Sequence, residues 1–287
     1  MQEHCGVIGI FSFDEHNIVP MLILGLESLQ HRGQEAWGIA VPEHPPFKRP
    51  GIVSQSVEKE SKRIAELKGN VGIGHVRYST TAKSTLRNAH PIRIGSSSLK
   101  HGFCIAHNGT LERDLLIEYL MEEGSSTPRG MTDTELMGLG LYKNLKEGKN
   151  WVKSFEDLNP YLNGSFSTVI LTAKGELIAA RDEKGFRPLC LGWHEETSSY
   201  IVASESCALD VLGAHLIRDD QPGEIIKISK EGLTSEKFSV QERHAHCPFE
   251  YTYFANPSSR IEGVNVYMAR KNIGRLLAEI YPLDGDI

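Results

Sequence analysis

Residues 165–240 constrain the fold most, because short apolar segments alternate there with tight turns. The turns at Lys174-Gly175 and Lys230-Glu231-Gly232 are too short for a helical crossover, so they join antiparallel neighbours. We expect strands at residues 166–172, 177–181, 189–193, 200–204, 224–228 and 233–240. Because helical spacing occurs before and after this region, the sequence predicts a layered α+β domain built on antiparallel sheets.

Helix patterns occur mainly in the first half of the chain. Apolar residues spaced by three and four predict amphipathic helices over residues 18–29 and 111–120. Thr132 and Glu135 have the spacing of a capping box and predict the start of another helix. The four prolines of residues 42–50 predict a surface loop.

Three further segments complete the expected secondary structure. Asn108-Gly109 is expected to end a strand, at its junction with the helix over residues 111–120. Residues 251–255 predict an aromatic strand, and residues 263–280 predict a helix with one apolar side. That helix followed by a turn is typical of the start of an α/β domain.

The first residues place a thiol beside a buried strand. Val7-Ile8-Gly9-Ile10-Phe11 is short, apolar and β-branched, and it predicts a buried strand that holds Cys5 rigidly. If residues 1–4 are removed, Cys5 carries a nucleophilic sulfur and a free α-amine, whose pKa of about 7.7–8 suits a proton shuttle. The alternative is a buried structural cysteine.

Charge and cysteine content exclude several classes of protein. Lys and Arg number 31 against 37 for Asp and Glu, a net charge of −6, so we expect no nucleic acid or anionic membrane as a partner. The five cysteines show no C-x-x-C spacing, which argues against a disulfide framework and a self-contained zinc site. No apolar run approaches the ~18 residues of a membrane span. We therefore expect a cytoplasmic protein.

Polar residues at element ends are the candidate site residues, and each has a structural alternative. Arg77 ends a glycine-spaced strand, where it can clamp a carboxylate or form a surface ion pair. Asp133 can bind an ammonium group or simply favour the positive end of a helix. Asn108-Gly109 can stabilise an oxyanion or form a plain turn.

Taken in order, the motifs resemble one enzyme family. Cys5, His31-Arg32-Gly33-Gln34, His75-Val76-Arg77-Tyr78-Ser79-Thr80, His107-Asn108-Gly109-Thr110 and Asp133-Thr134-Glu135 resemble the class II glutamine amidotransferases. The stretches at residues 181–189, 203–210 and 249–255 are similar to the amidophosphoribosyltransferase branch. The resemblance implies an N-terminal-nucleophile hydrolase fold, a four-layer αββα sandwich of two antiparallel sheets.

The resemblance also implies roles for eight residues. Cys5 would be the catalytic nucleophile, with Asn108 and Gly109 as the oxyanion hole. Arg77 and Asp133 would bind the α-carboxylate and α-amine of glutamine. The other substrate-binding residues would be Thr80, Tyr78 and Arg32.

The activity implied by the family couples two reactions. Glutamine is hydrolysed to glutamate and ammonia through a Cys5 thioester, and the ammonia reacts with phosphoribosyl pyrophosphate to give 5-phosphoribosylamine, the first step of purine biosynthesis. We expect residues 1–4 to be a propeptide, residues 5–240 the glutaminase domain, and residues 241–287 a linker with an incomplete start of a phosphoribosyltransferase domain. The transferase half is then a partner, either elsewhere in the chain or as a separate subunit, and the family implies a homo-oligomer.

Cofactors and processing complete these expectations. No cofactor or metal is expected in this chain, although relatives use Mg²⁺ with phosphoribosyl pyrophosphate and some carry a [4Fe–4S] cluster, for which Cys247 is the candidate ligand. Because Gln2 is not small, exposing Cys5 requires cleavage of the His4–Cys5 bond. Two alternatives are a glutaminase that serves another acceptor and an unprocessed regulatory or assembly subunit without catalysis.

Overall fold

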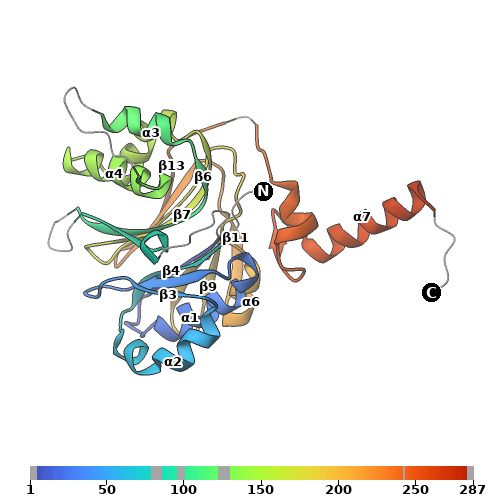
Figure 1. Cartoon of the computed structure of the whole chain (residues 1–287), viewed down its shortest axis with the longest axis horizontal. Helices are drawn as coiled ribbons and strands as arrows, with labels where there is room; N and C mark the ends of the chain where they lie inside the picture. The colour runs from blue at the N-terminus through green and yellow to red at the C-terminus, as the bar shows by residue number, and fades with distance from the viewer. Residues whose placement is uncertain (1–4, 79–85, 96–100, 122–129, 242, 283–287) are drawn as a thin grey trace.

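Two antiparallel sheets lie face to face, with helices on both outer sides (Figure 1). The computed structural model describes residues 5–78, 86–95, 101–121, 130–241 and 243–282. Within those residues the larger sheet has seven strands and the smaller has six. This arrangement confirms the predicted α+β layering and the αββα sandwich.

The seven-stranded sheet, here called sheet A, contains the first strand of the chain at its centre. Its strand order is β11-β9-β10-β1-β4-β2-β3. The strands are β1 (Gly6–Ser12), β2 (Ala36–Ala40), β3 (Phe47–Pro50), β4 (Val71–Arg77), β9 (Cys190–His194), β10 (Ser199–Ala203) and β11 (His215–Asp219). Its outer face is covered by α1 (Val19–Ser28), α2 (Val53–Glu66) and α6 (Ser206–Leu212).

The six-stranded sheet, here called sheet B, is built largely from the turn-rich second half. Its strand order is β13-β12-β8-β7-β6-β5. The strands are β5 (Ile92–Ile94), β6 (Phe103–Leu111), β7 (Gly164–Thr172), β8 (Leu177–Arg181), β12 (Glu224–Ser229) and β13 (Gly232–Lys237). Its outer face is covered by α3 (Arg113–Leu120), α4 (Asp133–Lys146) and α5 (Trp151–Leu158).

The core has three layers, and β1 shows why its sequence is apolar at every position. Ile8 and Ile10 pack under the helices of sheet A, whereas Val7 and Phe11 pack between the two sheets. Because both faces of the strand are covered, all seven of its residues are buried. A Cβ on Gly9 would lie 2.7 Å from a Leu177 methyl carbon, so glycine permits the close approach of the two sheets.

Several local predictions are confirmed, and two in the first half are wrong. The capping box of Thr132 and Glu135 is present at the start of α4. Residues 47–50 form β3 instead of a loop, because an edge strand tolerates Pro50. Asn108 and Gly109 lie inside β6, paired with β7, and the strand continues to Leu111. The tertiary pairing with β7 therefore overrides the local turn signal.

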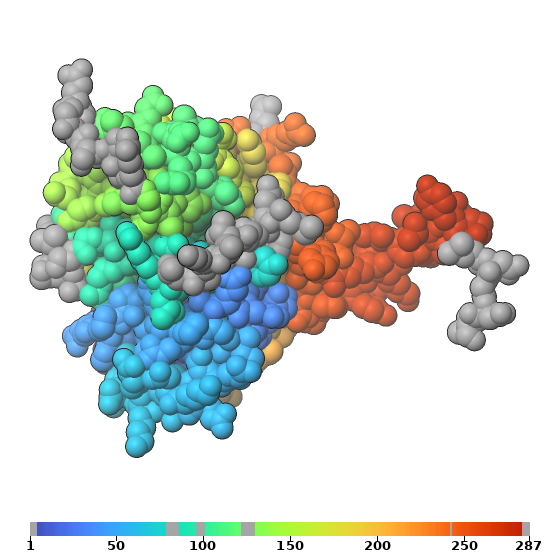
Figure 2. Space-filling view, in the orientation of Figure 1, coloured from blue at the N-terminus to red at the C-terminus, as the bar shows by residue number. Residues whose placement is uncertain are grey.

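Residues beyond the two sheets form a separate extension (Figures 1 and 2). The predicted strand over residues 251–255 is wrong, since Glu250–Phe254 form a π-helical turn, η4. A two-stranded ribbon of β14 (Arg260–Ile261) and β15 (Val264–Asn265) precedes α7 (Val266–Ile280). Helix α7 projects away from the sandwich, and its apolar side chains are mostly exposed, with Leu277 at 58% and Ile280 at 66%.

Among the helices of the described residues, none is both long enough and apolar enough to cross a bilayer.

Candidate active site

Cys5 lies directly before β1, at the edge of the space between the sheets. It is 7% exposed. Its backbone N–H donates to Asn108 Oδ1 at 3.4 Å, and its thiol contacts the Tyr78 carbonyl oxygen at 3.9 Å. The odd-numbered residues of β1 face sheet B, and Cys5 continues that face. The thiol and the main-chain nitrogen of one residue therefore both face the neighbouring sheet.

Asn108 presents an unused donor beside Cys5. Its side chain is completely buried, and its Oδ1 accepts the Cys5 N–H. Within the described residues, its Nδ2 has no hydrogen-bond partner. The next residue, Gly109, has φ +152°, and a Cβ there would overlap the Ser165 carbonyl oxygen. Only glycine therefore fits at this position.

A small cavity of about 70 Å³ brings most of the predicted site residues together. Arg77 enters from the end of β4 and Asp133 from the first turn of α4. The Asp133 carboxylate accepts hydrogen bonds from the backbone N–H groups of Leu111, at 3.0 Å, and Thr134, at 2.8 Å. The described residues that line the cavity are Cys5, His75, Arg77, Tyr78, His90, His107, Gly109, Thr132, Asp133 and Thr134.

Three buried histidines line this cavity, and sequence reasoning gave them no role. Burial lowers the pKa of all three, to about 3 for His75 and well below the usual value for His90. They are therefore neutral at pH 7. The His75 and His90 rings lie 4.4 Å apart, between their centroids. His75 and His107 lie within the Arg77 and Asn108 motifs, and this position is a sequence signal that could have identified them, whereas His90 lies outside both motifs.

Arg32 does not line the cavity, although it was expected to. Its side chain is fully buried, and its Nε donates to the Cys5 carbonyl oxygen at 2.9 Å. Its two terminal nitrogens donate to Glu250, at 2.9 and 2.8 Å, and one of them also donates to Glu205 at 2.5 Å. The Arg32 side chain thus contacts the main chain of Cys5.

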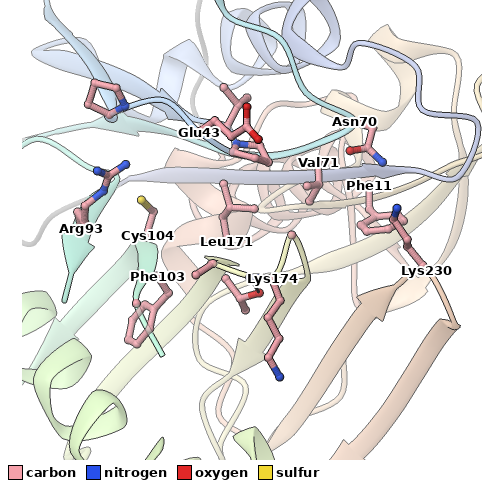
Figure 3. A pocket seen from close by; sticks show the side chains of 17 residues that line it. Phe11, Glu43, Asn70, Val71, Arg93, Phe103, Cys104, Leu171, Lys174 and Lys230 are labelled. Carbon is pink, nitrogen blue, oxygen red and sulfur yellow. Dashed lines mark hydrogen bonds between the residues drawn. The ribbon is translucent and has the colours of Figure 1, made fainter. Parts of the chain in front are cut away.

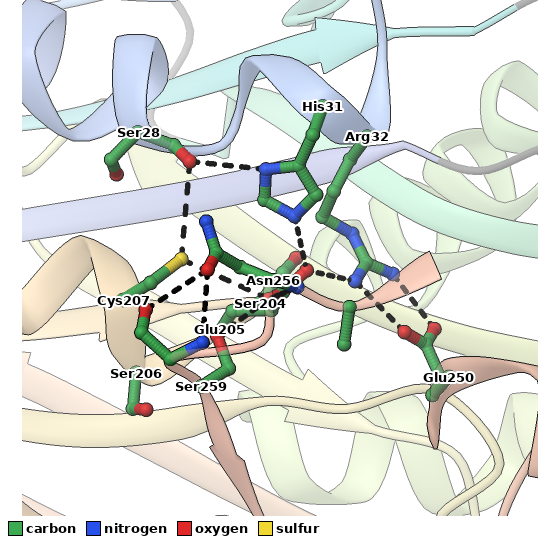
Figure 4. A network of polar contacts seen from close by, with 12 residues as sticks. Ser28, His31, Arg32, Ser204, Glu205, Ser206, Cys207, Glu250, Asn256 and Ser259 are labelled. Carbon is green, nitrogen blue, oxygen red and sulfur yellow. Dashed lines mark hydrogen bonds and ion pairs between the residues drawn. The ribbon is translucent and has the colours of Figure 1, made fainter. Parts of the chain in front are cut away.

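Glu205 is the centre of this polar network, which Figure 4 shows. His31 Nε2 lies 2.8 Å from Glu205 Oε1, while Oε2 accepts from the Asn256 N–H at 2.8 Å and the Ser259 hydroxyl at 2.6 Å. Burial alone would raise the pKa of Glu205, but the Arg32 guanidinium and the His31 hydrogen bond hold it well below its usual range. The network therefore ties Cys5 to residues 250–259.

The larger cavity in Figure 3, about 590 Å³, is not lined by Cys5, Arg77 or Asp133. It is lined by Phe11, which lies near the end of β1 opposite to Cys5. It is also lined by Cys104, which lies at the start of β6, before Asn108 on the same strand. Burial raises the pKa of the Cys104 thiol, so this cysteine is a poor nucleophile. We therefore take the smaller cavity at Cys5 as the candidate active site.

Cys247 is the predicted ligand of an iron–sulfur cluster. Such a cluster needs four thiolates, and Cys247, which is buried, belongs to no group of three metal-ligating side chains among the described residues. The one such group found in the described part of the chain consists of His31, Glu205 and Cys207. In that group, the negative charge of Glu205 is already balanced by its ion pair with the Arg32 guanidinium.

Two of the sequence predictions fall outside what the structure describes. Thr80, a predicted substrate-binding residue, lies outside the described residues, as do residues 1–4, the predicted propeptide. Glu205 and Glu250 were named only as parts of motifs and not as site residues. A carboxylate within an otherwise buried segment is the signal that could have identified them.

Comparison with known proteins gives a consistent result. The family model described as "Glutamine amidotransferase domain" matches residues 83–211. The chain is 40% identical over 98% of its length to amidophosphoribosyltransferase of Archaeoglobus fulgidus, and 36% identical over 99% to that of Methanocaldococcus jannaschii. It spans 61% and 62% of the length of these two relatives.

The solved structures agree with the sequence matches. Glutamine phosphoribosylpyrophosphate amidotransferase from Bacillus subtilis, solved with ADP and GMP, gives a TM-score of 0.85 at 34% identity, covering 98% of this chain and 60% of that chain. The sandwich is therefore an N-terminal-nucleophile hydrolase fold. These matches together show that the chain carries the glutamine amidotransferase domain of the amidophosphoribosyltransferase family.

Proposed function

We propose that this chain hydrolyses glutamine through a thioester on Cys5, and that the ammonia serves transfer to phosphoribosyl pyrophosphate to make 5-phosphoribosylamine, at the start of purine biosynthesis. The observation that carries the proposal is that Cys5, Arg77 and Asp133 line one cavity. A zwitterionic amino acid needs a cation and an anion at one end and a nucleophile at the other. That set of groups is present around this cavity.

The chemistry assigns a step to each group. The α-amine of Cys5 takes the thiol proton as the Cys5 sulfur attacks the side-chain carbonyl carbon of glutamine, and the resulting oxyanion accepts hydrogen bonds from Asn108 Nδ2 and the Gly109 N–H. The C–N bond then breaks, and the α-amine of Cys5 delivers the proton that the leaving ammonia needs. Water hydrolyses the thioester and releases glutamate. Asn108 Nδ2 is buried and has no hydrogen-bond partner in the part of the chain that the structure describes, which supports this role, because an oxyanion would satisfy it.

This mechanism requires a free amine at Cys5, and hence cleavage of the His4–Cys5 bond. The main-chain nitrogen already donates to Asn108 at 3.4 Å, so the freed amine would have an acceptor that orients it. The transfer step requires the phosphoribosyltransferase half that the longer relatives supply. Mg²⁺ would act with phosphoribosyl pyrophosphate in that half, and we propose no metal among the residues of this chain.

The test is the intact mass of the purified protein before and after treatment with a glutamine-mimicking electrophile. We expect loss of residues 1–4 and one adduct on Cys5, and no adduct in Cys5→Ala. Cys104→Ala is the matched control, because it removes another buried thiol at the opposite end of the sandwich, and it should label normally. Glutamine hydrolysis that persists in Cys5→Ala would refute the mechanism.

The acceptor is tested separately, with the transferase half present. Glutamine hydrolysis that rises on addition of phosphoribosyl pyrophosphate supports the proposed acceptor. An active glutaminase that does not respond to phosphoribosyl pyrophosphate would leave the hydrolysis in place and exclude this acceptor.

A further inference from the structure

Strand β5 stops short of the residue that precedes Asn108. It pairs with β6 through Ile92 opposite Ile105 and Ile94 opposite Phe103. Extending this register by two residues places His90 opposite His107. Pro91 intervenes and lacks an N–H group, and the described strand begins only at Ile92. Among the described residues, the edge of β6 at His107 therefore has no main-chain partner on this side.

Two histidine side chains occupy the place of the absent strand. The His107 N–H donates to His90 Nδ1 at 3.4 Å, and the His107 carbonyl oxygen lies 3.2 Å from His75 Nε2. An antiparallel partner residue supplies an acceptor and a donor to the residue opposite it. Here the acceptor comes from the loop before β5, and the donor comes from β4 of the other sheet.

We propose that His90 and His75 are positioning residues of the glutaminase reaction, whose ring nitrogens replace the absent strand opposite His107 and so hold Asn108 and Gly109 in register with Cys5. The inference rests on the proposed function of Asn108. Both imidazoles are buried, at 7% and 0% exposure, so water does not compete for these bonds. His107 itself is fixed from the other side of the sheet, since its Nδ1 lies 3.0 Å from the Thr134 hydroxyl.

The required ring protonation is specific. His90 Nδ1 must carry a lone pair to accept the His107 N–H, and His75 Nε2 must carry a hydrogen to donate to the carbonyl oxygen. Both rings are thus neutral with the hydrogen on Nε2. In agreement, His75 Nδ1 has no hydrogen-bond partner within the described residues. Burial, which lowers the pKa of both rings, favours the same neutral state.

The geometry predicts a loss in kcat and not in glutamine binding. Asn108 Nδ2 would act on the oxyanion, which exists only during the reaction, whereas Arg77 and Asp133 would bind the substrate. A misplacement of about 1 Å can cost about 10²-fold in rate. Removing the His90 acceptor should therefore lower kcat about 10- to 100-fold. KM should change by less than about threefold in either direction.

The experiment uses the full chain processed to begin at Cys5 and compares His90→Leu with His90→Asn. The Asn side chain places its oxygen at the same distance from Cα as Nδ1, so it should keep kcat within about threefold of the wild type. The His107 amide should exchange with solvent roughly tenfold faster in His90→Leu than in the wild type. The ¹⁵N shifts of His75 and His90 should both report the Nε2–H tautomer.

His194→Leu is the matched control. His194 Nδ1 also accepts a backbone N–H, that of Thr197 at 3.3 Å, but it ends β9 far from Cys5 along the sheet. It should lose stability without losing kcat. If His90→Leu does not fold, His75→Gln, which keeps a donor at the ε position, is compared with His75→Leu.

The outcomes separate this inference from the proposed function. A processed wild-type chain without Cys5-dependent hydrolysis would refute the function and with it the role of the histidines. An active chain in which His90→Leu keeps the kcat of His194→Leu, or loses it equally with His90→Asn, would refute the inference alone. Loss of kcat in the leucine variant, rescue by asparagine and faster His107 exchange would together support it.

Discussion

Replacing Glu250 by glutamine tests whether the buried ionic network holds Cys5 in place. Glu250 belongs to η4, outside the two sheets, yet its carboxylate makes two hydrogen bonds to Arg32, whose Nε donates to the Cys5 carbonyl oxygen. Glutamine has nearly the same shape, keeps one acceptor and removes the charge. The substitution therefore weakens the contact without leaving a cavity.

The size of the effect follows from burial and from the remaining partner. A charge-assisted hydrogen bond contributes about 1.5–3 kcal/mol, and removing one member of a buried ion pair costs about 3–5 kcal/mol. Glu250 is 2% exposed, but Arg32 keeps Glu205 as a second anion. We therefore expect a loss of about 2–3 kcal/mol, which for a chain of this size lowers Tm by roughly 4–10 °C.

Thermal unfolding followed by circular dichroism measures this loss, and steady-state glutamine hydrolysis by the processed chain measures the effect on Cys5. We expect kcat to fall about tenfold, because the main chain of Cys5 loses part of its support. Glu60→Gln is the matched control: Glu60 pairs with Arg49 at 2.7 Å, but both side chains are partly exposed. Equal changes in Tm for the two variants would contradict the reasoning.

Three further predictions concern single groups. Asn108→Ala should lower kcat about 10²- to 10³-fold with little change in KM, and steady-state kinetics with an unchanged kcat would exclude the oxyanion role. Because Arg32 holds the pKa of Glu205 below its usual value, this carboxylate stabilises the fold above about pH 4.5 and the stabilisation is lost as the pH falls; Glu205→Gln should therefore flatten the acid limb of a plot of Tm against pH. Asp220 is buried, its carboxylate has no hydrogen-bond partner among the described residues, and burial together with Glu224 raises its pKa to about 7. Stability is therefore lost as the pH rises from about 4 through 7, so Asp220→Asn should raise Tm by roughly 2–6 °C at pH 8 and leave it unchanged at pH 4.

Local signals in the sequence predicted those parts of the fold that depend on near neighbours. The continuous apolar run after Cys5 indicated a buried strand, and β1 is such a strand. The spacing of Thr132 and Glu135 predicted the start of α4, because a capping box is formed within four residues. The short turns after β7 and β12 predicted antiparallel neighbours for the same reason.

The candidate site was only partly accessible to such reasoning. The motif residues Cys5, Arg77 and Asp133 were named from the sequence, and the fold brings them to one cavity. Asn108-Gly109 was misread locally, because an Asn-Gly pair normally favours a turn whereas pairing with β7 keeps it in a strand. The histidines gave no periodic or spacing signal of their own.

Long-range contacts were decided by the tertiary structure alone. Arg32 is separated by 173 residues from Glu205 and by 218 from Glu250, and no local pattern relates a buried arginine to carboxylates so distant in the chain. The same holds for His90, which faces His107 only because β5 begins at Ile92. By itself the sequence determined most of the strands and helices and the chemistry of the motif residues, because these depend on neighbouring residues. The contacts that hold Cys5 and Asn108 in place were decided only by the packing of the two sheets, because buried polar side chains that are distant in the sequence must form hydrogen bonds with one another.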